Sequence, residues 1–123
     1  VVFPIHPRTE AILAHRAPSF KNIRLVAPQG YLNFMHLVSQ SFAVITDSGG
    51  LSEETTLLGI PCFTMRTTTE RPETITTGTN TLVGTSVTEL SAAYKSLLAN
   101  GRRSAGIPEL WDGRAAERLV DIL

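Results

Sequence analysis

The feature that most constrains the fold is the regular alternation of short apolar runs with segments of helical spacing. The pattern predicts strands at residues 1–5, 23–26, 42–46, 60–65 and 81–84. It predicts helices at residues 10–16, 31–39, 51–58, 87–98 and 114–123. Repeated β-α order is typical of a parallel sheet with helices on both faces. At 123 residues, the chain is predicted to form one α/β domain.

Local signals predict the ends and surroundings of several elements. Thr9 is the expected N-cap of the first helix, and Gly59 is the expected stop of the third. Residues 42–46 are continuously apolar, which is typical of a strand covered on both faces. Residues 67–79 are rich in threonine and are predicted to be a loop.

Composition and charge exclude some classes of partner and site. Lys plus Arg and Asp plus Glu number 11 each, so neither a nucleic-acid nor a membrane-surface partner is expected. No apolar run approaches the ~20 residues of a membrane span. The single cysteine, Cys62, fits a buried thiol in a reducing compartment, which predicts a cytoplasmic protein. No His, Cys or carboxylate spacing indicates a metal site, and no cofactor is expected.

Polar segments follow three of the predicted strands. These segments are residues 6–8, 47–50 and 69–73. Ligands of open parallel sheets bind beyond the carboxyl ends of the strands. The sequence therefore predicts a binding site at one edge of the sheet.

The second of these segments, Asp-Ser-Gly-Gly, connects a strand to a helix. Free backbone N–H groups and the helix dipole favour an anion there, and glycine lets a phosphate approach closely. Alternatively, Ser48 only caps the helix and the glycines only form a tight turn. The same letters occur around the nucleophile of trypsin-like proteases. That interpretation fails because those proteins are all-β and because Thr46, not glycine, precedes the segment.

Two acids and one arginine are further candidates. Glu53 and Glu54 are expected in the first helical turn, and neighbouring side chains diverge by about 100°. One could accept hydrogen bonds from a ligand diol; alternatively, both are surface charges that match the helix dipole. Arg71 precedes a proline and is expected on an extended backbone, suited to bidentate phosphate binding. Alternatively, it is a surface residue that pairs with Glu70 or Glu73.

Several blocks carry a resemblance when they are taken together. They are residues 4–9, 29–34, 46–54, 59–61, 69–73, 78–80, 82–84 and 111–118. In this order they resemble the C-terminal domain of non-hydrolysing UDP-N-acetylglucosamine 2-epimerases. Ser52 and Thr67 depart from the family pattern, which often has Gln and Asp there.

The resemblance implies the C-terminal half of a glycosyltransferase-B-like fold, in which two Rossmann-like domains face a cleft. UDP would lie on this half. Ser48, Gly49 and Gly50 would hold the diphosphate. Glu54 would bind the ribose hydroxyls, and Arg71 would reach the diphosphate or the sugar.

Two further residues are implicated by the same resemblance. Phe34 would pack against the uracil, although its helical stripe with Leu37 and Val38 also fits a core position. His6 lies where the family has a histidine that faces the cleft. No catalytic residue is expected in this segment, because the carboxylates that handle protons belong to the N-terminal domain.

The resemblance also implies an incomplete domain within residues 1–123. Residue 1 lies in what resembles the second strand, so the first strand, its helix and the N-terminal domain are expected partners outside this segment. A strand edge left open favours self-association, here as a homo-oligomer. The parent would isomerise UDP-N-acetylglucosamine for cell-envelope polysaccharides, whereas the segment alone would bind UDP weakly and not epimerise. The alternatives are a glycosyltransferase domain and a non-catalytic nucleotide-sugar-binding fragment.

Overall fold

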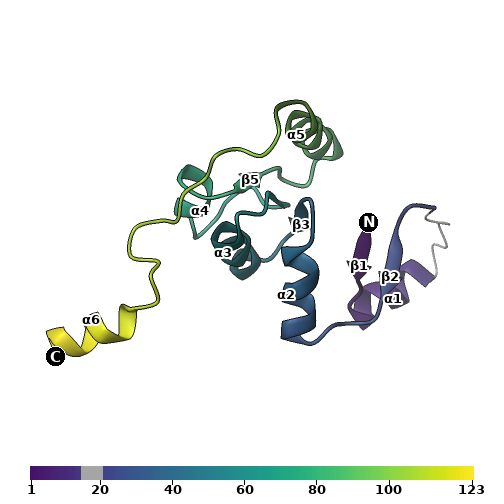
Figure 1. Ribbon diagram of the computed structural model, residues 1–123. Coiled ribbons are helices and arrows are strands. Elements are labelled where there is room, and N and C mark those ends of the chain that lie inside the picture. The colour runs from purple at the N-terminus through teal and green to yellow at the C-terminus, as the bar shows by residue number, and fades with distance from the viewer. Residues whose placement is uncertain (15–20) are drawn as a thin grey trace. The chain divides into compact units, whose positions relative to one another are not determined.

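The computed structural model describes residues 1–14 and 21–123. The chain divides into two compact units, residues 1–37 and 38–123. Each unit contains helices and a parallel sheet, so the predicted α/β fold with parallel strands is confirmed (Figure 1).

The first unit is built on a two-stranded parallel sheet. Strand β1 (Val2–Pro4) pairs in parallel with β2 (Arg24–Val26). Helix α1 (Pro7–Ala14) follows β1, and helix α2 (Tyr31–Ser39) follows β2 and continues across the unit boundary. The bounds of α2 are those predicted from its apolar spacing.

Helix α1 begins earlier than predicted. The His6 carbonyl accepts hydrogen bonds from the N–H groups of Thr9 and Glu10, so Thr9 lies inside the helix and is not its N-cap. The reason is Pro7, whose fixed φ suits the first helical position and whose missing N–H costs nothing there. Residues 15–16 of the predicted helix lie outside the described residues.

The second unit is built on a three-stranded parallel sheet. Its strands are β3 (Val44–Thr46), β4 (Cys62–Thr64) and β5 (Asn80–Leu82), in the order β3-β4-β5. The central strand, β4, is buried at each of its residues. This sheet carries the residues that form the candidate site.

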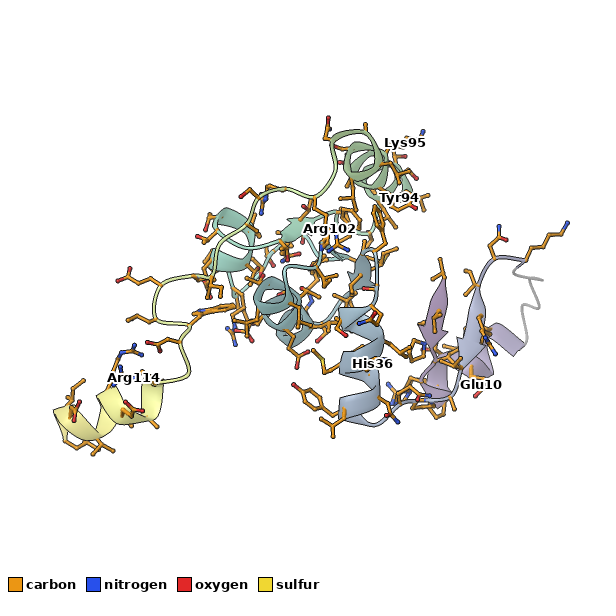
Figure 2. The ribbon with its side chains drawn as sticks, in the orientation of Figure 1. Glu10, His36, Tyr94, Lys95, Arg102 and Arg114 are labelled. Atoms are coloured by element: carbon orange, nitrogen blue, oxygen red, sulfur yellow. The ribbon has the colours of Figure 1, made fainter. Side chains whose placement is uncertain are left out.

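Strand β3 is not covered on both faces, contrary to the sequence prediction. It lies at the edge of its sheet, and Ile45 is 49% exposed. Phe42, just before the strand, is also 49% exposed, and the guanidinium of Arg102 (labelled in Figure 2) lies 5.9 Å from the centre of the Phe42 ring. The apolar run therefore predicted the strand. It did not predict that the strand lies at the edge of the sheet, because that position depends on which strands pair with each other.

Helices cover both faces of the second sheet. Helix α3 (Gly49–Leu58) packs on one face, where its Thr55 hydroxyl bonds the Cys62 thiol. Side chains alternate along a strand, so Phe63 points to the other face. There it joins a buried cluster with Val83 and with Leu97 of α5 (Val87–Asn100). Strand β4 is fully buried because both of its faces are covered in this way.

Two short helices complete the second unit. Helix α4 (Glu73–Thr76) interrupts residues 67–79, which the sequence predicted to be loop throughout. Helix α6 (Ala115–Ile122) lies near the C-terminus, as predicted. Within the described part of the chain, no helix combines the length and the apolar character that a membrane span requires.

Candidate functional site

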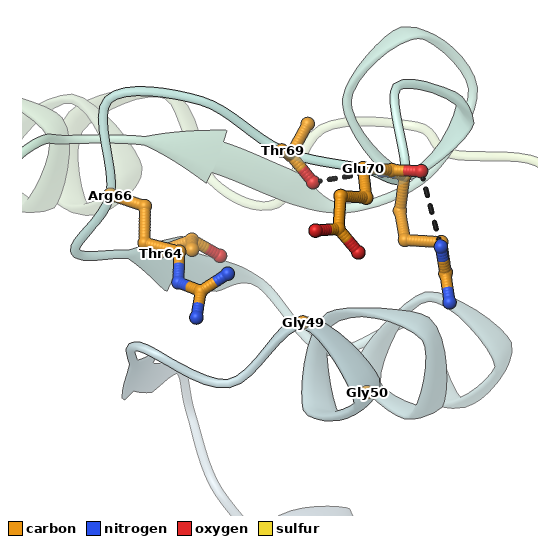
Figure 3. Close-up of a pocket in the computed structure, with 7 residues that line it drawn as sticks. Gly49, Gly50, Thr64, Arg66, Thr69 and Glu70 are labelled. Carbon is orange, nitrogen blue, oxygen red and sulfur yellow. Dashed lines mark hydrogen bonds between the residues drawn. The ribbon is translucent and has the colours of Figure 1, made fainter.

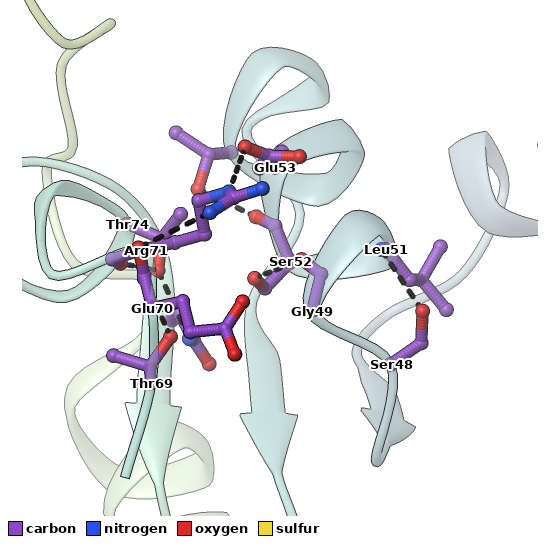
Figure 4. Close-up of polar contacts among 11 residues, drawn as sticks. Ser48, Gly49, Leu51, Ser52, Glu53, Thr69, Glu70, Arg71 and Thr74 are labelled. Atoms are coloured by element: carbon purple, nitrogen blue, oxygen red, sulfur yellow. Dashed lines mark hydrogen bonds and ion pairs between the residues drawn. The ribbon is translucent and has the colours of Figure 1, made fainter.

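The turn from β3 into α3 has the conformation predicted for a capped helix. Ser48 is the N-cap, with an extended backbone, and its Oγ accepts a hydrogen bond from the Leu51 N–H at 3.4 Å (Figure 4). Its own N–H donates to Thr46 Oγ1 at 3.0 Å. At the other end, Gly59 stops the helix with φ +67°. The capping role of Ser48 is confirmed, and its role in phosphate binding stays a prediction.

Gly49 and Gly50 form the first turn of α3, yet the fold does not require glycine at either position. Neither has a positive φ. A Cβ added at Gly49 would meet no atom within 4 Å, and one at Gly50 would meet only Ser48 Oγ, at 4.0 Å. Glycine destabilises a helix relative to alanine by ~0.5–1 kcal/mol. Open space beside both residues therefore favours close approach of a ligand over a tight turn.

These glycines line a cavity of about 290 Å³ (Figure 3). Its walls come from the start of α3, the end of β4 and the segment before α4. They are formed by Gly49, Gly50, Thr64, Arg66, Thr69, Glu70 and Arg71. Ligand pockets usually measure ~300–1,000 Å³, so this volume suits a small polar group such as a diphosphate.

Arg71 is fixed at the cavity by a partner that the sequence did not indicate. Its Nε donates to Glu53 Oε1 at 2.5 Å, and its Nη1 donates to the Glu70 carbonyl at 3.2 Å. The partner is neither the Glu70 nor the Glu73 carboxylate, which the sequence had left open as alternatives. The two side chains of the pair are 43% and 34% exposed, so solvent weakens its contribution to folding. Its geometric effect is to hold the guanidinium beside α3.

Glu54 lies at a second cavity. The sequence predicted both glutamates in the first turn of the helix. Because α3 starts at Gly49, both lie in the second turn instead. Glu54 lines a space of about 360 Å³ together with Glu53, Leu57, Trp111 and Gly113. Glu53 thus borders this space while bonding Arg71 of the first cavity. Ser48 lines neither of the two cavities.

His6 and Phe34 belong to the first unit. His6 is exposed, and its Nδ1 accepts a hydrogen bond from the Arg8 N–H at 3.2 Å. Phe34 is half-buried on α2, and its N–H donates to the Gly30 carbonyl at 2.9 Å. The roles implied for both residues stay predictions.

The one cysteine is buried and free, as predicted from the sequence. Burial raises the pKa of the Cys62 thiol, and hydrogen bonds with the Thr55 and Thr64 side chains oppose this shift. A protonated, buried thiol is a poor nucleophile. Among residues 1–14 and 21–123, the His, Cys, Asp and Glu side chains form no group that could hold a metal ion.

Comparison with known proteins decides the family. The sequence matches the UDP-N-acetylglucosamine 2-epimerase family over residues 1–123. The chain belongs to this family. The epimerase of Methanocaldococcus jannaschii is 41% identical over 128 residues, and that of Escherichia coli K12 is 36% identical over 129. Both alignments cover 100% of this chain but 34% of the relative, so the chain spans about a third of their length.

Solved structures of epimerases agree with this assignment. The M. jannaschii UDP-GlcNAc 2-epimerase in complex with UDP-GlcNAc and UDP superposes with a TM-score of 0.84 at 40% identity. The superposition covers 98% of this chain and 34% of the M. jannaschii chain. The Neisseria meningitidis enzyme bound to UDP-GlcNAc gives a TM-score of 0.73 at 32% identity, over 98% of this chain and 34% of its own. The fold of the chain is therefore the Rossmann-like fold of these epimerases.

Sequence reasoning missed two polar residues of the first cavity. Arg66 and Thr64 both line it, yet neither lies in the polar segments that the sequence singled out. The available signal was position, since β4 ends at Thr64 and Arg66 follows two residues later. In open parallel sheets, that is the edge at which ligands bind.

Proposed function

We propose that this chain forms the UDP-binding part of an enzyme that interconverts UDP-N-acetylglucosamine and UDP-N-acetylmannosamine. The observation that carries the proposal is the cavity in which Gly49, Gly50, Arg66 and Arg71 meet. The family match supports an epimerase over a glycosyltransferase domain. The chain spans 34% of the length of its M. jannaschii relative, so the activity of a whole enzyme would require residues outside this chain.

The first cavity suits a diphosphate on electrostatic grounds. The first N–H groups of a helix lack intrahelical partners, and the helix dipole places positive potential there. Arg66 supplies a second guanidinium in addition to that of Arg71. The carboxylate of Glu70 lines the same cavity and offsets part of this positive charge (Figure 3). Guanidinium groups bind phosphate oxygens in bidentate geometry. The diphosphate would therefore lie between α3 and the segment that follows β4.

The second cavity suits the ribose. Glu54 would accept hydrogen bonds from the two ribose hydroxyls, as a carboxylate binds a diol. Glu53 borders the same space and bonds Arg71, so the two cavities share the Glu53–Arg71 pair. A nucleoside diphosphate could thus extend from one cavity into the other.

The reaction proposed for the whole enzyme inverts C2 of the sugar in two steps. A base removes the C2 proton while the bond between C1 and the UDP oxygen breaks, which yields 2-acetamidoglucal and UDP. UDP then adds back to C1 while a proton returns to C2 on the opposite face. Residues of this chain would stabilise the negative charge on departing UDP, and the carboxylates that transfer protons would lie elsewhere.

Strand pairing supports a domain whose first strand and helix lie outside this chain. A doubly wound sheet has the order 3-2-1-4-5-6, in which the first strand has two neighbours. Among the described residues, β1 pairs only with β2, and β3 pairs only with β4. If β1 to β5 correspond to strands 2 to 6 of that order, the first strand lies outside this chain. The N-terminal domain would likewise lie outside.

Titration of the 123-residue chain with UDP, UDP-N-acetylglucosamine and ADP tests the proposal. NMR chemical shifts, which detect weak binding, should report both uridine ligands at lower concentrations than ADP. Arg71→Ala and Glu54→Ala should weaken the binding of both uridine ligands, because they remove the contacts to the diphosphate and to the ribose. Lys95→Ala is the control, because Lys95 is an exposed cation on α5 and lines neither cavity.

Two results would contradict the proposal. Equal responses to UDP and ADP, or none to either, would rule out a uridine diphosphate site. Formation of UDP-N-acetylmannosamine by the chain alone would show that the proton-transferring carboxylates lie within these 123 residues.

A further inference from the structure

A row of buried polar side chains runs from the wall of the first cavity to the backbone of Arg71. The Thr64 hydroxyl donates to Asn80 Oδ1 at 2.6 Å. Asn80 Nδ2 donates to the Thr74 hydroxyl at 3.1 Å, and that hydroxyl donates to the Arg71 carbonyl at 2.7 Å. Exposure is 2% for Thr64, 1% for Asn80 and 0% for Thr74. The three side chains therefore connect β4, β5 and α4 to the segment that carries Arg71.

The direction of each hydrogen bond in this row is determined by its neighbours. A threonine hydroxyl has one proton to donate, and an amide oxygen can only accept. Thr64 therefore donates its proton to Asn80 Oδ1. The Asn80 amide nitrogen donates to the Thr74 hydroxyl, so Thr74 can donate its own proton to the Arg71 carbonyl. A carboxylate at position 80 would instead accept the Thr74 proton and withdraw it from the Arg71 carbonyl. The row thus requires an amide at this position.

We propose that Asn80 and Thr74 are positioning residues that hold Arg71 for the diphosphate of the nucleotide. This inference rests on the proposed UDP site. The Arg71 side chain is fixed by Glu53, and its carbonyl is fixed by the N–H and hydroxyl of Thr74. Both ends of the residue are thus held before a ligand arrives. Such preorganisation increases affinity, because less conformational entropy is lost on binding.

The position of Thr74 in the row predicts a specific effect on ligand choice. Arg71 would contact the diphosphate and not the nucleoside, so loss of its support should weaken UDP binding and leave uridine binding unchanged. A merely structural defect would weaken both ligands together. The ratio of the UDP and uridine dissociation constants therefore separates positioning from general loss of structure.

The test titrates the 123-residue chain and its variants with UDP and with uridine, followed by NMR. Thr74→Val keeps the shape of the side chain but removes the hydroxyl, whereas Thr74→Ser keeps the hydroxyl. We expect Thr74→Val to weaken UDP binding by up to about tenfold, in line with the loss of one hydrogen bond between uncharged groups. Thr74→Ser should retain most of the affinity, and uridine should bind all three proteins equally.

Two more variants make the test robust to misfolding. Asn80→Asp preserves side-chain volume and should reduce the UDP-to-uridine preference as Thr74→Val does. In an Arg71→Ala background, Thr74→Val should have no further effect on UDP, because the residue it positions is gone. Circular dichroism identifies any variant that fails to fold, and the remaining variants then decide the question.

The outcomes distinguish this inference from the proposal on which it rests. If the unaltered chain binds UDP no better than uridine, the diphosphate site itself is wrong. If the unaltered chain prefers UDP and the folded Thr74→Val and Asn80→Asp chains keep the same preference, the positioning role is wrong. An equal effect of Thr74→Val with and without Arg71 would also overturn it.

Discussion

Alanine at Gly50 should make the chain more stable and at the same time impair its binding of UDP. The backbone of Gly50 has no positive φ, and an added Cβ would meet only Ser48 Oγ, at 4.0 Å. The fold therefore tolerates the methyl group. Cα–Cβ bonds tilt toward the N-terminus of a helix, so the methyl group would project from the end of α3 at which the cavity lies.

The two effects can be given approximate magnitudes. Replacing glycine by alanine in a helix raises the free energy of unfolding by ~0.5–1 kcal/mol, partly because the unfolded chain loses freedom. A methyl group in the path of a phosphate would displace at least one charge-assisted hydrogen bond, worth ~1.5–3 kcal/mol. At 1.4 kcal/mol per factor of ten, UDP should bind ~10- to 100-fold more weakly.

Gly59→Ala is the matched control at the other end of the same helix. Gly59 has φ +67°, and no atom lies within 4 Å of its missing Cβ. Alanine there should lower the free energy of unfolding by about 1–2 kcal/mol through backbone strain alone. Because Gly59 lines neither cavity, UDP affinity should be unchanged at temperatures where the variant is folded.

Thermal unfolding followed by circular dichroism, with UDP titration on the same samples, measures both quantities. The expected pattern is a higher Tm with weak binding for Gly50→Ala, and a lower Tm with unaltered binding for Gly59→Ala. A Gly50→Ala chain that binds UDP normally would refute the close-approach argument. A Gly50→Ala chain of lower stability would show that the fold itself requires this glycine.

Three further predictions concern charge, packing and pH. Arg66→Ala should weaken UDP binding about tenfold without affecting uridine binding, whereas Lys95→Ala should affect neither, as NMR titration would show. Gly78→Ala should lower the free energy of unfolding by ~1–3 kcal/mol in urea titrations, since its Cβ would clash with the Thr56 side chain and the Thr74 carbonyl and these atoms must move. Burial raises the pKa of Cys62 above its ordinary value of 9.0, so the folded chain holds the thiol proton more tightly than the unfolded chain. The free energy of unfolding should therefore fall as the pH rises through and above that value, and Cys62→Ala should reduce this slope.

The features that the sequence predicted correctly depend on a few neighbouring residues. Ser48 caps α3 and Gly59 ends it with φ +67°, because each conformation follows from the side chain at that position. The errors concern long-range relations. Arg71 pairs with Glu53, 18 residues away, and Ile45 is exposed although it lies in a continuously apolar run. Local patterns do not encode either result, because both depend on which elements pack against each other.

The core beneath the first cavity is rich in polar side chains, and this composition indicates a role of the core in addition to stability. Its largest fully buried side chains are Asn80, Thr55, Thr64, Thr74, Cys62 and Ser52. Apolar residues of similar volume would stabilise such a core without the need for hydrogen-bond partners. Hydrogen bonds have directions, however, and a satisfied polar network fixes the relative positions of the elements that it joins more narrowly than apolar contacts do. Here those elements are β4, β5 and α4, which carry or support the arginines at the cavity. The polar core is therefore better explained by precise placement of charge at the cavity than by stability.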